Sequence, residues 1–242
     1  MPATDDADAP SETGTRDDAA GPGEPGGDDG GVAATGGLSW GRAIVLAAAM
    51  CWLGGAVGWT IASRADAVDL GPVDTGFYLD MIAHHEQAVE MALIELGQGE
   101  DSTVVAFARE IIIVQEYEIG RMDEALRRSG VSRDDRGATA MEWMGMGVPV
   151  EAMPGMATGA QLEGLREATG NVADGLFLDL MAEHHRGGAH MAAYAADNAE
   201  DPAVRALAAR MERNQAIEVN EFRQTAERLG LDVEIDPITA GG

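Results

Sequence analysis

Cysteine and lysine are almost absent from this sequence, and each shortage excludes a kind of chemistry. The single cysteine, Cys51, can form neither a disulfide within the chain nor a cluster of thiolate metal ligands. No C-x-x-C-H segment occurs, which excludes covalently attached c-type haem. All 16 basic residues are arginine, which fits either a biased genome composition or a saline habitat.

Positive charge is also scarce: the 16 basic residues are outnumbered by 42 acidic residues, which gives the chain a formal net charge of −26. Proteins that bind nucleic acid meet its phosphates with lysine and arginine. We therefore expect no nucleic-acid partner. A strongly acidic surface attracts cations and favours solubility.

The first 62 residues divide into two parts of opposite character. Residues 1–37 are rich in Gly, Pro, Ala and acidic residues and hold a single basic residue, Arg16, so we predict a disordered acidic tail. Residues 43–62 contain no charge, and as a helix they would span about 30 Å, the thickness of a bilayer core. Trp40 and Trp59 lie near the ends of this stretch, as is typical of membrane interfaces.

We interpret residues 43–62 as a retained single-pass transmembrane helix. Two alternatives stay open: a signal peptide cleaved at the A-x-A-like segment 65–67, or a buried core helix. One arginine on each side, Arg42 and Arg64, gives no charge bias that would fix the orientation.

Two segments that lie 100 residues apart share the pattern M-x-x-H-H, followed six residues later by another Met. They contain four of the five histidines. A gapless comparison of residues 74–131 with 174–231 gives 16 identities in 58, which indicates an internal duplication. The repeated unit, 74–130 and again 174–230, has the caps and stop signals of a helical hairpin. One hairpin cannot cover its own apolar face, so we predict that the two pack as a four-helix bundle over residues 73–231.

Capping residues set the expected helix boundaries. The four helices are predicted from Asp74 or Thr75 to Gly97, Asp101 to Gly130, Asp174 to Ala199 and Asp201 to Gly230. Residues 231–242 are predicted to be a frayed end.

The insert at 132–173 contains five methionines within sixteen residues: Met141, Met144, Met146, Met153 and Met156. These residues either fill gaps and cover one end of the bundle or form a loop that binds a soft metal through thioethers. The segment Thr158-Gly-Ala-Gln161 predicts a short helix over about 159–169.

The repeated motif predicts a polar layer inside the bundle. Residues that lie equally far along the chain from the connection of a hairpin should share one layer of the bundle. By this count each His pair is level with Gln115 or Gln215, and the first Met of each motif is level with Glu118 or Glu218. Such a buried layer is costly unless a metal or a closed hydrogen-bond network satisfies it. The candidate metal ligands are His84, His85, His184, His185, Met81, Met91, Met181 and Met191. The candidate residues for orienting the His rings are Gln115, Glu118, Gln215 and Glu218. His190 is expected to face away from this layer.

The types of ligand indicate which metal would bind. Histidine and methionine without cysteine suit copper, and Cu(I) in particular, whereas zinc would use the imidazoles alone. A di-iron oxidase needs Glu-x-x-His, and here Met81 and Met181 stand three residues before the His pairs, which disfavours iron.

At these residues the sequence resembles the bacterial family 305 of domains of unknown function. The resemblance rests on the paired M-x-x-H-H motifs and on Q-x-x-E in the following helices, over about residues 73–230. The chain departs from the family pattern at Ala83 and Glu183, where Pro is frequent, and at Phe222, which replaces the Met found at Met122. The resemblance implies a ferritin-like helical bundle and, as in some members, extracytoplasmic copper binding.

The sequence therefore predicts an all-α protein anchored in the cell membrane, with an extracytoplasmic bundle that binds copper for tolerance, storage or delivery. This favours a binding protein over an enzyme. Two alternatives stay open: a copper- or iron-dependent redox enzyme on the same bundle, and a metal-free, membrane-tethered interaction domain with a purely structural His layer.

Overall fold

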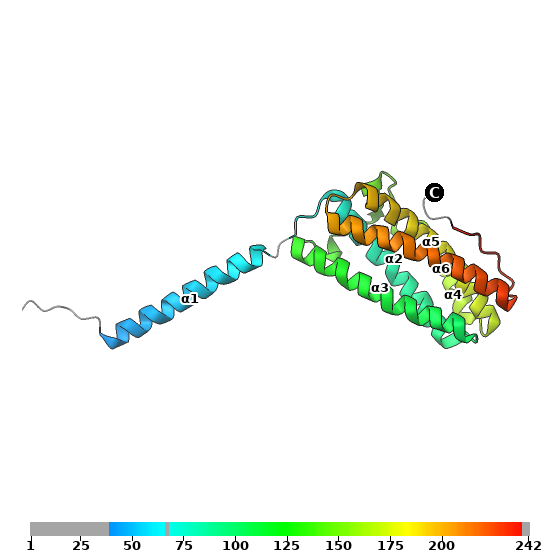
Figure 1. Cartoon of the computed structure of the whole chain (residues 1–242), viewed down its shortest axis with the longest axis horizontal. Helices are drawn as coiled ribbons and strands as arrows, with labels where there is room; N and C mark the ends of the chain where they lie inside the picture. The colour runs from blue at the N-terminus through cyan, green and yellow to red at the C-terminus, as the bar shows by residue number, and fades with distance from the viewer. Residues whose placement is uncertain (1–38, 66–67, 239–242) are drawn as a thin grey trace, which may run out of the picture. The chain divides into compact units, whose positions relative to one another are not determined.

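A computed structural model describes residues 39–65 and 68–238 of the chain, and the acidic tail predicted at 1–37 lies outside these ranges. The described part is almost entirely helical, as predicted (Figure 1). Its α-helices are α1 (Trp40–Ala65), α2 (Pro72–Gln98), α3 (Ser102–Ser129), α4 (Gly159–Glu167), α5 (Asn171–Asn198) and α6 (Pro202–Leu229). Two short strands, β1 (Thr139–Ala140) and β2 (Val148–Pro149), pair antiparallel within the insert.

Helix α1 is long and apolar enough to cross a membrane over Trp40–Ile61, and no part of that stretch is buried in the protein. A signal sequence can pass the same test of length and hydropathy, so the helix indicates either a membrane span or an export segment. Its cysteine, Cys51, is exposed and unpaired.

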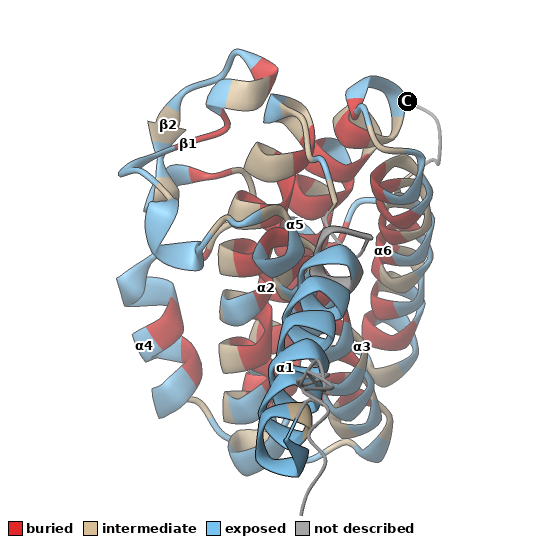
Figure 2. Cartoon of the chain, turned by 90° about the vertical axis from the view of Figure 1, so that its left-hand side faces the viewer, coloured by how far each residue is buried: buried red, intermediate tan, exposed pale blue. Residues whose placement is uncertain are grey.

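The helices α2, α3, α5 and α6 form a four-helix bundle, in which α2 and α5 are the central pair and each packs against its own hairpin partner. Figure 2 shows that the buried residues of these helices face the interior. Apolar residues of α3 that recur at helical spacing are buried from Val104 to Leu126. Burying apolar area of this kind stabilises the fold by roughly 25 cal/mol per Å².

The predicted starts of α3 and α6 and their glycine stops are confirmed. The carboxylate of Asp101 accepts hydrogen bonds from the backbone amides of Thr103 and Val104, and Asp201 caps α6 in the same way through Ala203. Both helices end at glycines in the left-handed region, with φ of 81° at Gly130 and 65° at Gly230.

Helices α2 and α5 begin earlier than predicted, because Asp74 and Asp174 do not cap their own helices as N-cap residues. Asp74 accepts hydrogen bonds from the backbone amides of Glu200 and Asp201 in the connection of the other hairpin. Asp174 does the same for Glu100 and Asp101. Each central helix therefore fastens the turn of the opposite hairpin.

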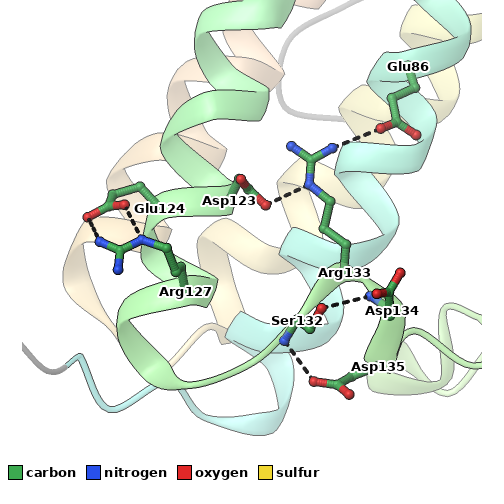
Figure 3. Close-up of polar contacts among 8 residues, drawn as sticks. All are labelled: Glu86, Asp123, Glu124, Arg127, Ser132, Arg133, Asp134 and Asp135. Atoms are coloured by element: carbon green, nitrogen blue, oxygen red, sulfur yellow. Dashed lines mark hydrogen bonds and ion pairs between the residues drawn. The ribbon is translucent and has the colours of Figure 1, made fainter.

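The insert begins with the 3₁₀ turn η1 (Arg133–Asp135), which is fixed to two helices (Figure 3). The guanidinium of Arg133 lies 3.0 Å from Glu86 on α2 and 2.6 Å from Asp123 on α3. Further on, the insert forms η2 (Glu142–Met144) and η3 (Val150–Ala152), and the buried carboxylate of Asp80 accepts hydrogen bonds from the Met141 amide and the Trp143 indole. The insert is thus tied mainly to α2.

The predicted short helix is α4, with Thr158 and Gln161 forming the expected capping box. The prediction of a frayed end is wrong for residues 231–238. Ile235 is buried, the Arg186 side chain donates to the Asp236 carbonyl, and the Asn220 amide donates to the Ile238 carbonyl. One apolar anchor and two backbone acceptors are enough to hold this segment against the bundle.

Candidate metal centre

Two histidines from different hairpins stack on each other at the centre of the bundle. The ring centroids of His84 on α2 and His184 on α5 are 3.7 Å apart, with the ring planes inclined by 31°. Both side chains are almost fully buried. One histidine from each motif therefore meets the other inside the bundle, where the polar layer was predicted.

A backbone carbonyl selects the tautomer of His84. Its Nε2 lies 3.1 Å from the Pro154 carbonyl oxygen, which can only accept, so Nε2 carries the proton and donates it. The lone pair then lies on Nδ1, which is buried and has no hydrogen-bond partner. A ring held in this way offers one nitrogen as a ready-made ligand.

Two glycines allow the insert to pack closely against α5. A Cβ on Gly187 of α5 would stand 1.8 Å from the Pro154 carbonyl oxygen. Gly155 has a φ of 81°, and a Cβ there would lie 2.4 Å from the Glu183 carbonyl oxygen. Pro154, Gly155 and Gly187 were not predicted to belong to the site. The Pro-Gly pair of the insert and the Gly-Gly pair after the second His motif were the available signals.

Two glutamates orient the second histidine of each pair. His85 Nε2 lies 3.0 Å from Glu118 Oε2, and His185 Nε2 lies 2.7 Å from Glu218 Oε2. The first contact is a hydrogen bond, whereas the second is close but lacks hydrogen-bond alignment. The predicted layers are thus shifted by about one turn: the glutamates, rather than Gln115 and Gln215, contact the His rings.

The two glutamines are buried near the layer, and each leaves its side-chain oxygen without a partner. Gln215 packs against Gly188, where a Cβ would lie 2.3 Å from its Oε1. His190 is exposed, as predicted.

Burial keeps the stacked imidazoles neutral. It lowers the pKa of His84 to about 3 and that of His184 well below its ordinary value, and the neighbouring imidazoles act in the same direction. A neutral ring keeps the lone pair that binds a metal. These two residues need no deprotonation before they can act as ligands at neutral pH.

Several ring nitrogens in this layer have no hydrogen-bond partner although they are buried. They are His84 Nδ1, His85 Nδ1, His184 Nε2 and both nitrogens of His185. An unsatisfied buried polar atom costs about 1–3 kcal/mol, and native structures contain few of them. Unpartnered imidazole nitrogens of this kind are candidate ligands for a bound cation.

The four candidate methionine ligands are fully buried on either side of the His layer. Met81 and Met191 belong to one apolar cluster, and Met91 and Met181 belong to the other. Over residues 39–65 and 68–238, no three His, Cys, Asp or Glu side chains converge as a metal site by themselves.

The insert methionines mostly fill gaps, in agreement with the first of the two interpretations. Met141, Met144 and Met153 are buried in the cluster that contains Met81, while Met146 is exposed and Met156 is half-buried. This part of the insert covers the end of the bundle and also reaches the His layer through Pro154.

Comparisons with known proteins agree with the resemblance seen in the sequence. The family model described as Domain of unknown function (DUF305) matches residues 74–226. The crystal structure of a candidate secreted protein of this family from Streptomyces coelicolor is 34% identical, with a TM-score of 0.61 over 69% of this chain and 96% of that one. A family fragment from Deinococcus radiodurans is 27% identical, with a TM-score of 0.57 over 66% and 99%.

The protein CopM in its Cu(I)-bound form is 27% identical, with a TM-score of 0.49 over 64% of this chain and 96% of that one. None of the curated proteins matches the chain. The family model covers more than half of the chain, and the described helices 72–229 contain the paired His motifs that carry the resemblance. The chain therefore belongs to the family of the Domain of unknown function (DUF305).

Proposed function

We propose that the bundle binds copper, in the Cu(I) state, at the His layer between α2 and α5. The single observation that supports this most strongly is the group of buried, unpartnered imidazole nitrogens of His84, His85, His184 and His185. Burial makes the stacked pair neutral, and the fixed tautomer of His84 leaves its lone pair on Nδ1.

The chemistry of the ligands favours copper over the alternatives. Thioether sulfur selects soft ions such as Cu(I), and the chain has buried methionines three residues before and six residues after its His pairs: Met81, Met91, Met181 and Met191. Structural zinc sites use four His, Cys or carboxylate ligands, and no such convergence occurs in the described ranges. Iron would need carboxylates where the chain has Met81 and Met181.

The proposed role is copper tolerance, storage or delivery, carried out outside the cytoplasm by a bundle tethered through α1. The apolar stretch Trp40–Ile61 supports membrane attachment. Full-length protein should then sediment with membranes and resist carbonate extraction. Protease added to intact cells should digest the bundle, and recovery of an intact bundle would contradict the extracytoplasmic placement.

A thermal shift assay tests the binding. A ligand that binds only the native state raises the melting temperature, by an amount that grows with its concentration over the dissociation constant. Cu(I) should raise the melting temperature of the full-length protein in detergent and leave that of the His84→Ala/His184→Ala variant unchanged. If both proteins respond equally, the His layer is not the copper site. If neither responds, the layer is a structural polar network.

A further inference from the structure

A cavity of about 260 Å³ opens between α3 and α6 and is lined by three carboxylates, those of Glu110, Glu218 and Glu221. Glu110 and Glu221 form no salt bridge in the part of the chain that the structure describes, and the Glu218 carboxylate lies 2.7 Å from the His185 ring. Burial together with the charges of Glu218 and Glu110 raises the pKa of Glu221. We call this cavity the α3/α6 groove.

A buried histidine lies behind two of the side chains that line the groove. His185 is 0% exposed, and neither of its ring nitrogens has a hydrogen-bond partner. Its Nε2 lies 2.7 Å from Glu218 Oε2, and its ring centroid lies 5.5 Å from that of Phe222. Glu218 and Phe222 both line the groove, so one layer of side chains separates the groove from the His layer.

At two pairs of matching positions, the two hairpins carry side chains of opposite charge. The first hairpin has Glu110 where the second has Arg210, and the second has Glu221 where the first has Arg121. Near Glu118, the Arg210 guanidinium approaches the Glu118 carboxylate to 3.8 Å, and the Glu118 side chain is only 6% exposed. The Glu218 side chain is 21% exposed and faces the acidic groove.

We propose that the α3/α6 groove binds a hydrated metal cation and passes it to His185, and so serves as the entrance to the His layer. This inference rests on the proposed copper site. Carboxylates in a cleft with low-dielectric walls concentrate cations and can raise association rates by about 10–1,000-fold. Arg210 and Arg121 repel cations at the matching end, so entry is one-sided. His85 and His185 therefore differ in access although both contact a glutamate.

The test is a quenched-flow measurement of silver(I) uptake by the full-length protein in detergent and nitrate buffer. Silver(I) is a soft monovalent ion that does not change its redox state in water. Excess chelator stops uptake after each delay, and the silver kept by the protein is then counted. The test variant is Glu110→Gln/Glu221→Gln, which keeps side-chain size and leaves the His, Met and Glu218 residues unchanged.

The matched control is Glu116→Gln/Glu212→Gln, which removes the same charge from the same two helices outside the groove. We expect the test variant to take up silver about tenfold more slowly at low ionic strength, while the control behaves as wild type. The difference should shrink toward 1 M sodium nitrate, where the screening length is about 3 Å. A transit site eases both entry and release, so the final silver content should be equal in all three proteins.

The possible results separate the two proposals. Wild type and test variant that fill at the same rate to the same level would overturn the groove and leave the copper site intact. Equal slowing of the test and control variants would also overturn it, because net charge alone would then explain the rate. A wild type that keeps no silver would overturn both proposals.

Discussion

The two hairpins share the residues that form the polar layer and differ in the residues that surround this layer. Both carry Met, His-His, Met, Gln and Glu at matching positions, and these residues are buried in both, apart from Glu218, which is half-buried. The residues around them differ: the first hairpin has Gln87 and Glu95, and the second has Gly187 and Ala195. The shared residues supply the ligands, and the unshared residues decide how each side of the layer is covered and reached.

The insert shows this difference most directly. It hydrogen-bonds to the Gln87 side chain in both directions through Ala157. It also lies against α5 where Gly187 has no side chain, which brings the Pro154 carbonyl to His84. A symmetric pair of hairpins thus acquires one covered face because only one of them has room for the insert.

The largest expected effect concerns Glu95, whose matching residue in the second hairpin is Ala195. Glu95 is fully buried beside Asp174 in the space left by Gly99. Burial, followed by hydrogen bonding and repulsion from Asp174, raises the pKa of Glu95 to about 9. Two ionised carboxylates cannot hydrogen-bond each other, so a proton on Glu95 makes it a donor to Asp174.

The difference in proton binding between the folded and unfolded states sets how the contribution of Glu95 to the free energy of unfolding changes with pH. The folded state holds this proton and the unfolded state releases it above its pKa of about 4.5, so the stabilisation is complete below that pH and is lost as pH rises toward about 9. Compared with Glu95→Gln, the wild type should lose at most about 1.4 kcal/mol per pH unit in this window. Urea unfolding from pH 5 to 9 measures the difference, and parallel curves for the two proteins would show that Glu95 is ionised when folded.

The next effect comes from filling the gap at Gly187. Gly187→Ala places a Cβ 1.8 Å from the Pro154 carbonyl oxygen, so the insert or the helix must move. Overpacking of this kind costs about 1–3 kcal/mol of unfolding free energy. Gly120→Ala is the control, because a Cβ there meets nothing within 4 Å, and helix propensity should stabilise it by about 0.5–1 kcal/mol. Chemical denaturation should therefore move the two variants in opposite directions. Equal shifts would mean that the insert does not press on α5.

The smallest effect is expected at Arg210, the cation that lies beside Glu118. The arginine side chain is 41% exposed and its nitrogen is 3.8 Å from the carboxylate, so solvent screens most of the attraction. Arg210→Gln should change the free energy of unfolding by less than about 1 kcal/mol. A loss of several kcal/mol in a urea titration would show that Glu118 depends on Arg210, and the two ends of the layer would then differ in stability as well as in access.

Local signals made much of the fold predictable. Helix ends are marked through contacts with neighbours in sequence, at Asp101, Asp201, Gly130 and Gly230. The M-x-x-H-H spacing places the first His of each pair on the same helical stripe as the Met residues of its motif. Contacts between distant segments carry no such signal. Asp74 and Asp174 look like caps of their own helices, yet both also bind the opposite turns, and only Asp74 accepts the amide that precedes its own helix as well.

The site was predicted as far as side-chain type and helical spacing allow. The approach of His84 to His184 follows from the repeat. The hydrogen bond from His84 to Pro154 does not, because a backbone carbonyl has no signature in a sequence. His85 contacts Glu118 rather than Gln115, which lies about one helical turn away. Counting residues from the connection of the hairpin cannot distinguish two positions that are only one turn apart.

The most direct test of the central claim is competition for Cu(I) between the full-length protein and a chromophoric chelator. The variants are His84→Ala/His184→Ala and His190→Ala, the latter a control that removes an exposed histidine outside the layer. Wild type and His190→Ala should take Cu(I) from the chelator with the same affinity, and the double variant should fail to do so. Equal uptake by all three proteins would contradict the assignment of the metal site to the His layer.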